Sequence, residues 1–330
     1  MTTQPAPPET TGGVSAWRDR LLTTLQRRGA IAVLILVVVV ASFAFDNFLT
    51  AQNLQNIVLQ GAFLGLIVVG MTFVIISGGI DLSVGSMVGL GGVLAALTVQ
   101  IAWPLALILP TLLCGLIGCG NGFLIAKAKM APFIVTLAGL LGIRGLALAF
   151  APGERPIRID GGSPLTWFGQ GQLFGVSVPV ILMVVVFAVG GLILARTSYG
   201  RVIFALGGSE ESARLMGLPV DRTKVIAYTT SGALAGFSGA LLAARLSAGD
   251  PNAGLAWELD AISAVVVGGT LLTGGAGSMS GSLAGVLLLS ILQNLINQLG
   301  TLGSYAQQLV SGFFLIVVVV AQAYLSRAQR

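Results

Sequence analysis

Long apolar runs separated by short polar segments fill most of the chain after residue 29. A membrane-crossing helix needs about 20 mostly apolar residues. The pattern predicts about ten spans, near residues 30–45, 57–76, 84–101, 104–126, 131–150, 177–195, 225–246, 260–273, 281–298 and 305–325. Several of these runs are short or broken by glycine. We therefore expect an all-α polytopic membrane protein with glycine-rich broken helices.

Composition supports a lipid environment. Of the 330 residues, 55% are apolar and only 9% are charged, and there is no histidine. Histidine is the commonest neutral-pH general base and metal ligand, so we expect neither a metal site nor a cofactor. Cys114 and Cys119 stand five residues apart in an apolar run, which suits small fillers of a packed helix better than disulfide or metal chemistry.

Charge is distributed unevenly between the predicted loops. If the N-terminus is cytosolic, the cytosolic segments are 1–29, 127–130, 196–224 and the tail 327–330. They carry 13 of the 17 Lys and Arg residues, which follows the positive-inside rule. Both termini are therefore expected in the cytosol, and the net charge of +5 needs no nucleic-acid partner.

This topology defines the domain organisation. We expect a partly disordered tail over 1–29, a transmembrane domain over 30–326 and a short tail over 327–330. The longest outer loop, 151–176, is rich in Pro, Gly and aromatic residues and predicts a turn-rich or short-stranded cap.

A glycine-rich break follows the second predicted span. Ser77, Gly78 and Gly79 interrupt a helix that would otherwise continue, and Asp81 and Ser83 come next. Broken backbone at membrane depth is tolerated where protein buries it or water lines it. Asp81 either caps a helix over 82–100 or contacts substrate or an ion, and the two roles can coexist.

Residues 266–286 echo residues 68–90. Both segments carry Val-Val-Gly-x-Thr, followed by a glycine pair (Gly78-Gly79 and Gly274-Gly275) and a Ser/Gly-rich stretch. A parallel internal repeat would place two pseudo-equivalent halves around a central path. Chance similarity between glycine-rich segments is the alternative.

The basic segment 196–224 predicts a short helix. Ser209 suits the N-cap, Glu210 and Glu211 suit the first turn, and Gly217 suits the C′ position before Pro219. Such a helix, Glu210 to Met216 with Ala213 and Met216 on one side, is marginal alone. The segment is either a docking surface or an ordinary basic cytosolic loop.

Four blocks carry a family resemblance, in collinear order over about residues 50–325. They read SGGIDLSVGSMVGL (77–90), APFIVTLAGLLGIRGLAL (131–148), YGRVIFALGGSEESARLMGLPVDRTK (199–224) and LDAISAVVVGGTLLTGGAGSMSGSLAG (259–285). Together they resemble the ribose-type permease family of bacterial ABC importers. The resemblance implies a multi-pass inner-membrane subunit that works as a homo- or heterodimer. It would receive a sugar from a periplasmic binding protein and be driven by a cytosolic ATPase.

The resemblance also implies roles for particular residues. The family's cytosolic coupling helix corresponds to Glu210, Glu211, Ser212, Ala213, Arg214 and Gly217, with Ser209 before it. Relatives often carry asparagine at 209 and alanine at 212. Glu258 and Asp260 would lie at the outer mouth, where they contact the binding protein or merely cap the next helix.

A translocation path needs only neutral polar groups such as Ser77, Ser83, Thr270 and Ser278, or no tight site at all, because the binding protein supplies selection. Candidates at the breaks are Ser77, Gly78, Gly79, Asp81, Ser83, Thr270, Gly274, Gly275 and Ser278. Arg144 lies far along its span, where it either snorkels to the interface or contacts the acidic mouth.

Two rival functions use the same membrane fold. An ion-coupled secondary transporter would place ionisable relays in mid-span, where only Asp81 and Arg144 are candidates. A passive channel would need a filter motif or a ring of charge, and neither is evident. The chain contains no GxxxxGK[ST] phosphate loop, so a partner must hydrolyse ATP; the subunit itself is not expected to be an enzyme.

Overall fold

The computed structural model describes residues 31–299 together with 309, 312–313 and 316. The predicted tails 1–29 and 327–330 lie outside the described residues, as does nearly all of the predicted span 305–325. The helices are Ile31–Ala44, α2 (Ala51–Ile76), α3 (Val84–Thr98), α4 (Leu105–Ala126), α5 (Pro132–Phe150), α6 (Pro164–Gln170), α7 (Val178–Arg196), α8 (Ser198–Gly208), α9 (Glu210–Leu215), α10 (Val220–Leu246), α11 (Trp257–Val267) and α12 (Met279–Leu299).

Six described helices are long and apolar enough to cross a membrane: α2, α4, α5, α7, α10 and α12. Helix Ile31–Ala44 and α3 are apolar but shorter, and α11 has 11 residues where a longer span over 260–273 was predicted. The α11 helix ends at Val267 because Gly268, Gly269 and the turns after them cannot continue it.

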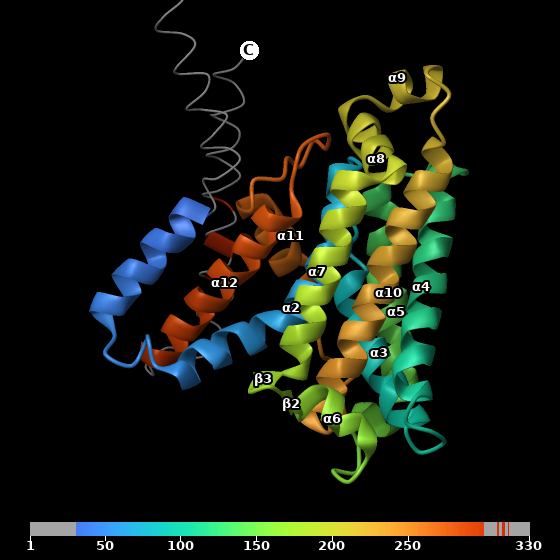
Figure 1. Cartoon of the computed structure of the whole chain (residues 1–330). Helices are drawn as coiled ribbons and strands as arrows, with labels where there is room; N and C mark the ends of the chain where they lie inside the picture. Colours follow the sequence, from blue (N-terminus) through green and yellow to red (C-terminus); the bar gives the residue numbers. More distant parts are fainter. Residues whose placement is uncertain (1–30, 300–308, 310–311, 314–315, 317–330) are drawn as a thin grey trace, which may run out of the picture.

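The bundle has two distinct ends (Figure 1). At one end α8 and α9 project beyond the long helices. At the other lie the 3₁₀ turn Pro152–Glu154, α6, and the two-residue strands β1 (Ile157–Arg158), β2 (Gln172–Leu173), β3 (Val176–Ser177) and β4 (Ala248–Gly249). Strand β1 pairs antiparallel with β4, and β2 pairs with β3. The predicted short-stranded cap over 151–176 therefore forms, with the unpredicted helix α6 inside it.

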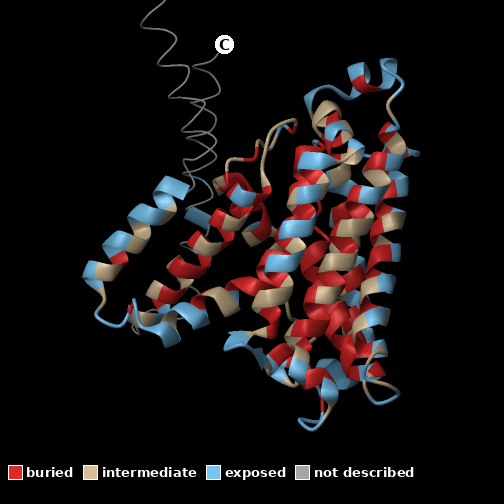
Figure 2. Ribbon diagram, in the orientation of Figure 1, coloured by how far each residue is buried: buried red, intermediate tan, exposed pale blue. Residues whose placement is uncertain are grey.

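Helix α3 lies at the centre of the bundle. Every residue of α3 except Leu97 is buried, as is every residue of α2 from Gly61 onward. Figure 2 shows the buried residues concentrated inside the bundle. Helix α3 packs against α4, α5 and α10. A Cβ on Gly91 would meet the backbone of Gly236 in α10, so small residues permit this close approach.

Two pairs of glycines at i,i+4 spacing have different surroundings. Gly61 faces Ser290 of α12 and Gly65 faces Met183 of α7, so this pair permits close helix packing. Gly85 and Gly89 do not face the backbone of another helix. They leave room for the side chains of Glu258 and Arg144 and for the loop 250–254.

Candidate functional site

The short helix α9 begins as the sequence predicts. Ser209 is the N-cap, and its hydroxyl accepts a hydrogen bond from the Ser212 backbone N–H at 3.2 Å. The Ser209 hydroxyl also donates to the Ser212 hydroxyl at 3.0 Å. The Ser212 side chain therefore extends the cap. Glu210 and Glu211 occupy the first turn, where the helix dipole favours negative charge.

The end of α9 is closed by Gly217 in the left-handed region, at φ +73°. The Leu218 N–H donates to the Ala213 carbonyl at 3.1 Å, and the Gly217 N–H donates to the Arg214 carbonyl at 2.9 Å. These two bonds form a Schellman motif, for which a non-glycine residue at this position is strained. The predicted role of Gly217 in ending the helix is confirmed.

One predicted feature of α9 is wrong. Ala213 is fully buried against Leu206 and Val220, but Met216 is 66% exposed and does not share that face. Met216 is the C-cap residue, beyond the helical turn, so its side chain points elsewhere. Leu215, at 83% exposure, lies beside it. The tip of α9 thus presents two large apolar side chains that are mostly exposed.

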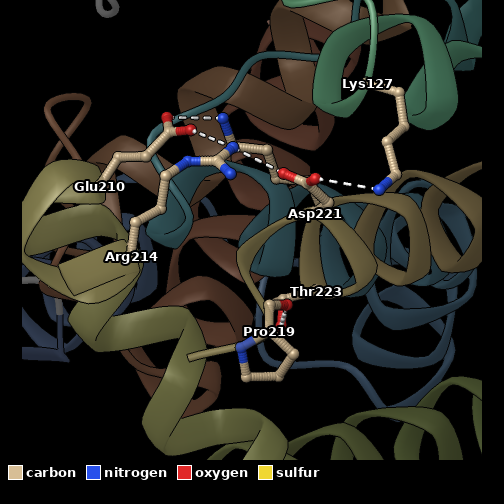
Figure 3. A network of polar contacts seen from close by, with 7 residues as sticks. Lys127, Glu210, Arg214, Pro219, Asp221 and Thr223 are labelled. Atoms are coloured by element: carbon tan, nitrogen blue, oxygen red, sulfur yellow. Dashed lines mark hydrogen bonds and ion pairs between the residues drawn. The ribbon is translucent and has the colours of Figure 1, made fainter. Parts of the chain in front are cut away.

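An ion-pair network joins α9 to α10 and to the turn after α4 (Figure 3). Arg214 contacts Glu210 at 3.1 Å and Asp221 at 2.6 Å. Lys224 contacts Glu210 at 2.6 Å, and Lys127 contacts Asp221 at 3.3 Å. The network holds α9 to the bundle and puts the basic segments 127–130 and 196–224 at the same end.

The network shifts the pKa of the Glu210 carboxyl group. Partial burial alone would raise the pKa of this carboxyl group. The hydrogen bonds and positive charges of Lys224 and Arg214 outweigh that effect, and the pKa is lowered from its ordinary value of 4.5. Glu211 has no ion pair within the described chain.

The two glycine-rich breaks meet at the C-terminal end of α8. The Gly275 N–H donates to the Ile76 carbonyl at 2.9 Å. A Cβ on Gly274 would lie 2.9 Å from Gly78 Cα and 3.0 Å from Gly207 Cα. We name this contact the glycine junction, formed by Gly78, Gly207, Gly208, Gly274 and Gly275. Since Gly208 immediately precedes Ser209, the junction is covalently continuous with α9.

Asp81 is completely buried between three helices. Its carboxylate accepts hydrogen bonds from the Ser83 N–H at 3.0 Å, the Ser83 hydroxyl at 2.6 Å and the Ser231 hydroxyl of α10 at 2.8 Å. Asn121 of α4 in turn donates to the Ser83 hydroxyl at 3.2 Å. Asp81 is not the N-cap of a helix from 82; α3 begins at Val84 with Ser83 as the N-cap. The carboxylate instead binds the donors just before the helix.

The remaining predicted path residues lie around the two breaks. The Ser77 hydroxyl donates to the Val74 carbonyl at 2.7 Å, and the Ser278 hydroxyl accepts from the Gly281 N–H at 3.1 Å. Gly79 is packed against the Tyr228 hydroxyl. Thr270 is buried, and its hydroxyl has no hydrogen-bond partner among the described residues.

Glu258 and Asp260 both lie in the first turn of α11, whose N-cap is Ala256. Of the two alternatives for Asp260, capping this helix is wrong, because Asp260 lies inside the first turn and the N-cap is four residues earlier. Arg144, on α5, is partly buried. Its guanidinium donates to the carbonyls of Pro251, Ala253 and Gly85, and so ties the loop before α11 to α3.

The sequence reading missed two features: the participation of Gly207 and Gly208 in the junction, and a cavity between α2, α10, α11 and α12 at the end opposite α9. The cavity had a recognisable signal in the sequence. Amide side chains recur at i,i+4 spacing in the first turns of α2 and the last turns of α12.

The fold and these breaks define a polytopic helical membrane protein, with a short-stranded cap at one end and the helices α8 and α9 at the other. Residues 53–320 match the family model described as "Branched-chain amino acid transport system / permease component". The chain belongs to this permease family. No solved structure matches it.

Curated relatives refine the comparison. The chain is 41% identical to the ribose import permease protein RbsC of Haemophilus influenzae over 91% of this chain and 94% of that protein. It is 41% identical to RbsC of Bacillus subtilis, covering 90% and 92%. It is 35% identical to the L-arabinose ABC transporter permease protein AraH of Azospirillum brasilense, covering 98% and 94%.

Proposed function

We propose that this protein is the membrane-spanning permease subunit of an ABC importer for a pentose or hexose sugar. The observation that carries the proposal is the near full-length similarity to ribose and arabinose import permeases, together with a capped, ion-paired helix where docking to an ATPase is expected. The subunit is not an enzyme; a partner ATPase hydrolyses ATP. It resides in the bacterial inner membrane with about ten spans and both termini in the cytosol.

The α9 end faces the cytosol in this proposal. The ion pair between Lys127 and Asp221 supports it, because it brings two basic segments to one end, as the positive-inside rule requires. Leu215 and Met216 are the apolar contacts offered to the ATPase. Ser209, Glu210, Glu211, Ser212, Ala213, Arg214 and Gly217 form the coupling element.

Movement of α9 reaches the path through the glycine junction. When the ATPase pair closes, α9 and α8 shift, and the backbone contacts of Gly207 with Gly274 and Gly78 transmit the shift to both breaks. Small residues allow the three segments to slide because no side chain interlocks there. Ser77, Gly79, Asp81, Ser83, Thr270, Gly275 and Ser278 line or support the path beside this point.

The remaining parts of the assembly follow the same scheme. A second permease chain, identical or paralogous, completes the path. A periplasmic sugar-binding protein docks at the opposite end, near Glu258 and Asp260. The helix–break–helix course of α2–α3 and of α11–α12 supports an internal pseudo-repeat, and the hydrogen bond from Thr72 to Ser282, 2.8 Å long, joins its two halves.

Charge reversal at Glu211 tests the coupling role. Glu211→Lys leaves the ion-pair network intact, so the transporter should assemble and keep its thermal stability while ATP-driven uptake falls. Glu211→Gln is the matched conservative variant and should retain more uptake. Wild-type uptake by Glu211→Lys would refute the assignment of this residue.

A further inference from the structure

A cavity of about 410 Å³ lies between α2, α10, α11 and α12, away from the glycine junction. Its polar lining comes chiefly from four primary amides: Asn56 and Gln60 of α2, and Gln293 and Asn297 of α12. Arg245 and Trp257 also contribute to the wall. We name it the amide cavity. Its volume is within the range of about 300–1,000 Å³ that is usual for small-molecule sites.

The amides stand in two helical rows. Asn56 and Gln60 are four residues apart on α2, and Gln293 and Asn297 are four residues apart on α12, so each pair faces the same side of its helix. Amides directed at hydrocarbon would be costly. Gln60 and Gln293 therefore require water, protein or a polar ligand in front of them.

The chemistry of the lining suits a neutral polyol. A primary amide offers two N–H donors and a carbonyl acceptor, and a sugar hydroxyl both donates and accepts. Trp257 adds an aromatic face for the C–H side of a sugar ring and one N–H donor. Within the described residues no carboxylate lines the cavity, so nothing there pairs with an ammonium group. This disfavours an amino acid.

The wall behind the cavity is fixed by a neighbouring set of amides. The Asn53 side-chain oxygen accepts from Asn294 at 2.9 Å and from Gln298 at 3.2 Å. Gln298 also donates to the Asn294 side-chain oxygen at 2.9 Å. These bonds join α2 to α12 beside the cavity and set the separation of its two walls. Preorganised polar groups bind a ligand at a lower entropic cost.

Helix α2 connects the cavity with the glycine junction. Gln60 lies in its first half, and Ile76, whose carbonyl binds Gly275, is its last residue. The cavity and the glycine junction therefore lie along one helix.

We propose that the amide cavity is a binding site for the neutral sugar inside the permease, occupied after the binding protein releases it and before the path opens at the junction. This inference rests on the proposed function, and it assigns Gln60, Gln293 and Trp257 as ligand contacts.

The test uses the complete transporter, with its ATPase and binding protein, reconstituted in lipid vesicles. The variant Gln60→Met/Gln293→Met keeps side-chain length but removes both amides. Sugar uptake should fall about tenfold, as expected for the loss of two hydrogen bonds of ordinary strength. ATP hydrolysis stimulated by the sugar-loaded binding protein should stay within about twofold of wild type, because these residues are distant from α9. Gln55→Met, on α2 but outside the cavity, is the control.

The outcomes separate the two claims. Sugar uptake by the double variant at the wild-type rate overturns the site. Absence of sugar uptake by the wild-type transporter, or uptake of leucine instead, refutes the proposed function itself. If the double variant does not reach the membrane, Trp257→Ala compared with Trp257→Phe gives the decision: the site predicts loss with alanine and retention with phenylalanine, and equal uptake contradicts it.

Discussion

The backbone N–H of Gly275 donates to the carbonyl of Ile76 at 2.9 Å, and this bond joins two glycine-rich breaks that are far apart in the sequence. Ile76 is the last residue of α2, so its carbonyl has no partner within the helix. Gly275 supplies that partner from the loop before α12. The contact is possible because Gly274 and Gly275 adopt positive φ angles of 85° and 78° and carry no side chain.

The first prediction concerns Gly274. Gly274→Ala adds a Cβ 2.9 Å from the Gly78 backbone at a positive φ, which costs about 1–2 kcal/mol from conformation alone. We expect a lower thermal unfolding temperature of the purified protein and slower sugar uptake. Gly145→Ala in α5 is the control, since a Cβ there would meet nothing within 4 Å. Equal unfolding temperatures for the two variants would contradict the packing described.

The second prediction concerns the end of α9. Gly217→Ala introduces no steric contact within 4 Å, so any effect comes from forcing alanine into φ +73°. The cost is about 1–2 kcal/mol, and it falls on the Schellman motif alone. ATP hydrolysis by the assembled transporter should persist while uptake per ATP hydrolysed declines. Gly120→Ala, also without a contact within 4 Å, should preserve the wild-type ratio; a preserved ratio in Gly217→Ala as well would exclude the coupling role.

The third prediction concerns Asp81. Removing the carboxylate in Asp81→Ala leaves the Ser83 and Ser231 donors unsatisfied inside the bundle, at a cost of about 1–3 kcal/mol for each such buried group. Asp81→Ala and Ser231→Ala should be non-additive in a double-mutant cycle of unfolding free energy, because they share one hydrogen bond. Additive losses would show that the bond contributes nothing. Uptake that remains in the variants should still require ATP. If Asp81 were instead an ion-coupling residue, its removal would abolish a dependence of uptake on protons or sodium.

The fourth prediction is a pH dependence. The pKa of Glu210 is lowered in the folded protein, so its ion pairs stabilise α9 fully above the ordinary value of 4.5. That contribution is lost as the pH falls below 4.5 through the folded-state pKa. Protease cleavage within 196–224 should therefore accelerate on acidification below pH 4.5. Glu210→Gln should already be cleaved faster at neutral pH and respond less to acid; an identical acid response in both proteins would exclude Glu210 as its source.

Local features of this chain could be predicted from the sequence, and distant contacts could not. Ser209 and Gly217 mark the ends of α9 because caps depend on residues within one turn. The apolar runs located α4, α5 and α7 to within a few residues. The predicted length of α11 was wrong, because the apolar run continues through Gly268 but the helix ends at Val267.

Contacts between distant segments could not be predicted from the sequence. Nothing in the sequence pairs Gly207 with Gly274, because their contact depends on how α8 packs against both breaks. Asp81 was recognised as an unusual carboxylate, yet its partner Ser231 is on α10, in a span with no distinctive pattern. The amide rows of α2 and α12 have a recognisable spacing, but only the packing of the helices shows that they line one open cavity.

If the proposed function is right, transport by this subunit depends on ATP and on a binding protein. Uptake of labelled ribose, arabinose, xylose and hexoses can be measured in cells that express the permease alone, with both its ATPase and its sugar-binding protein, or with one of these two omitted. We expect uptake of a sugar only when all three components are present. Uptake by the permease alone would refute this dependence and would instead favour an ion-coupled carrier.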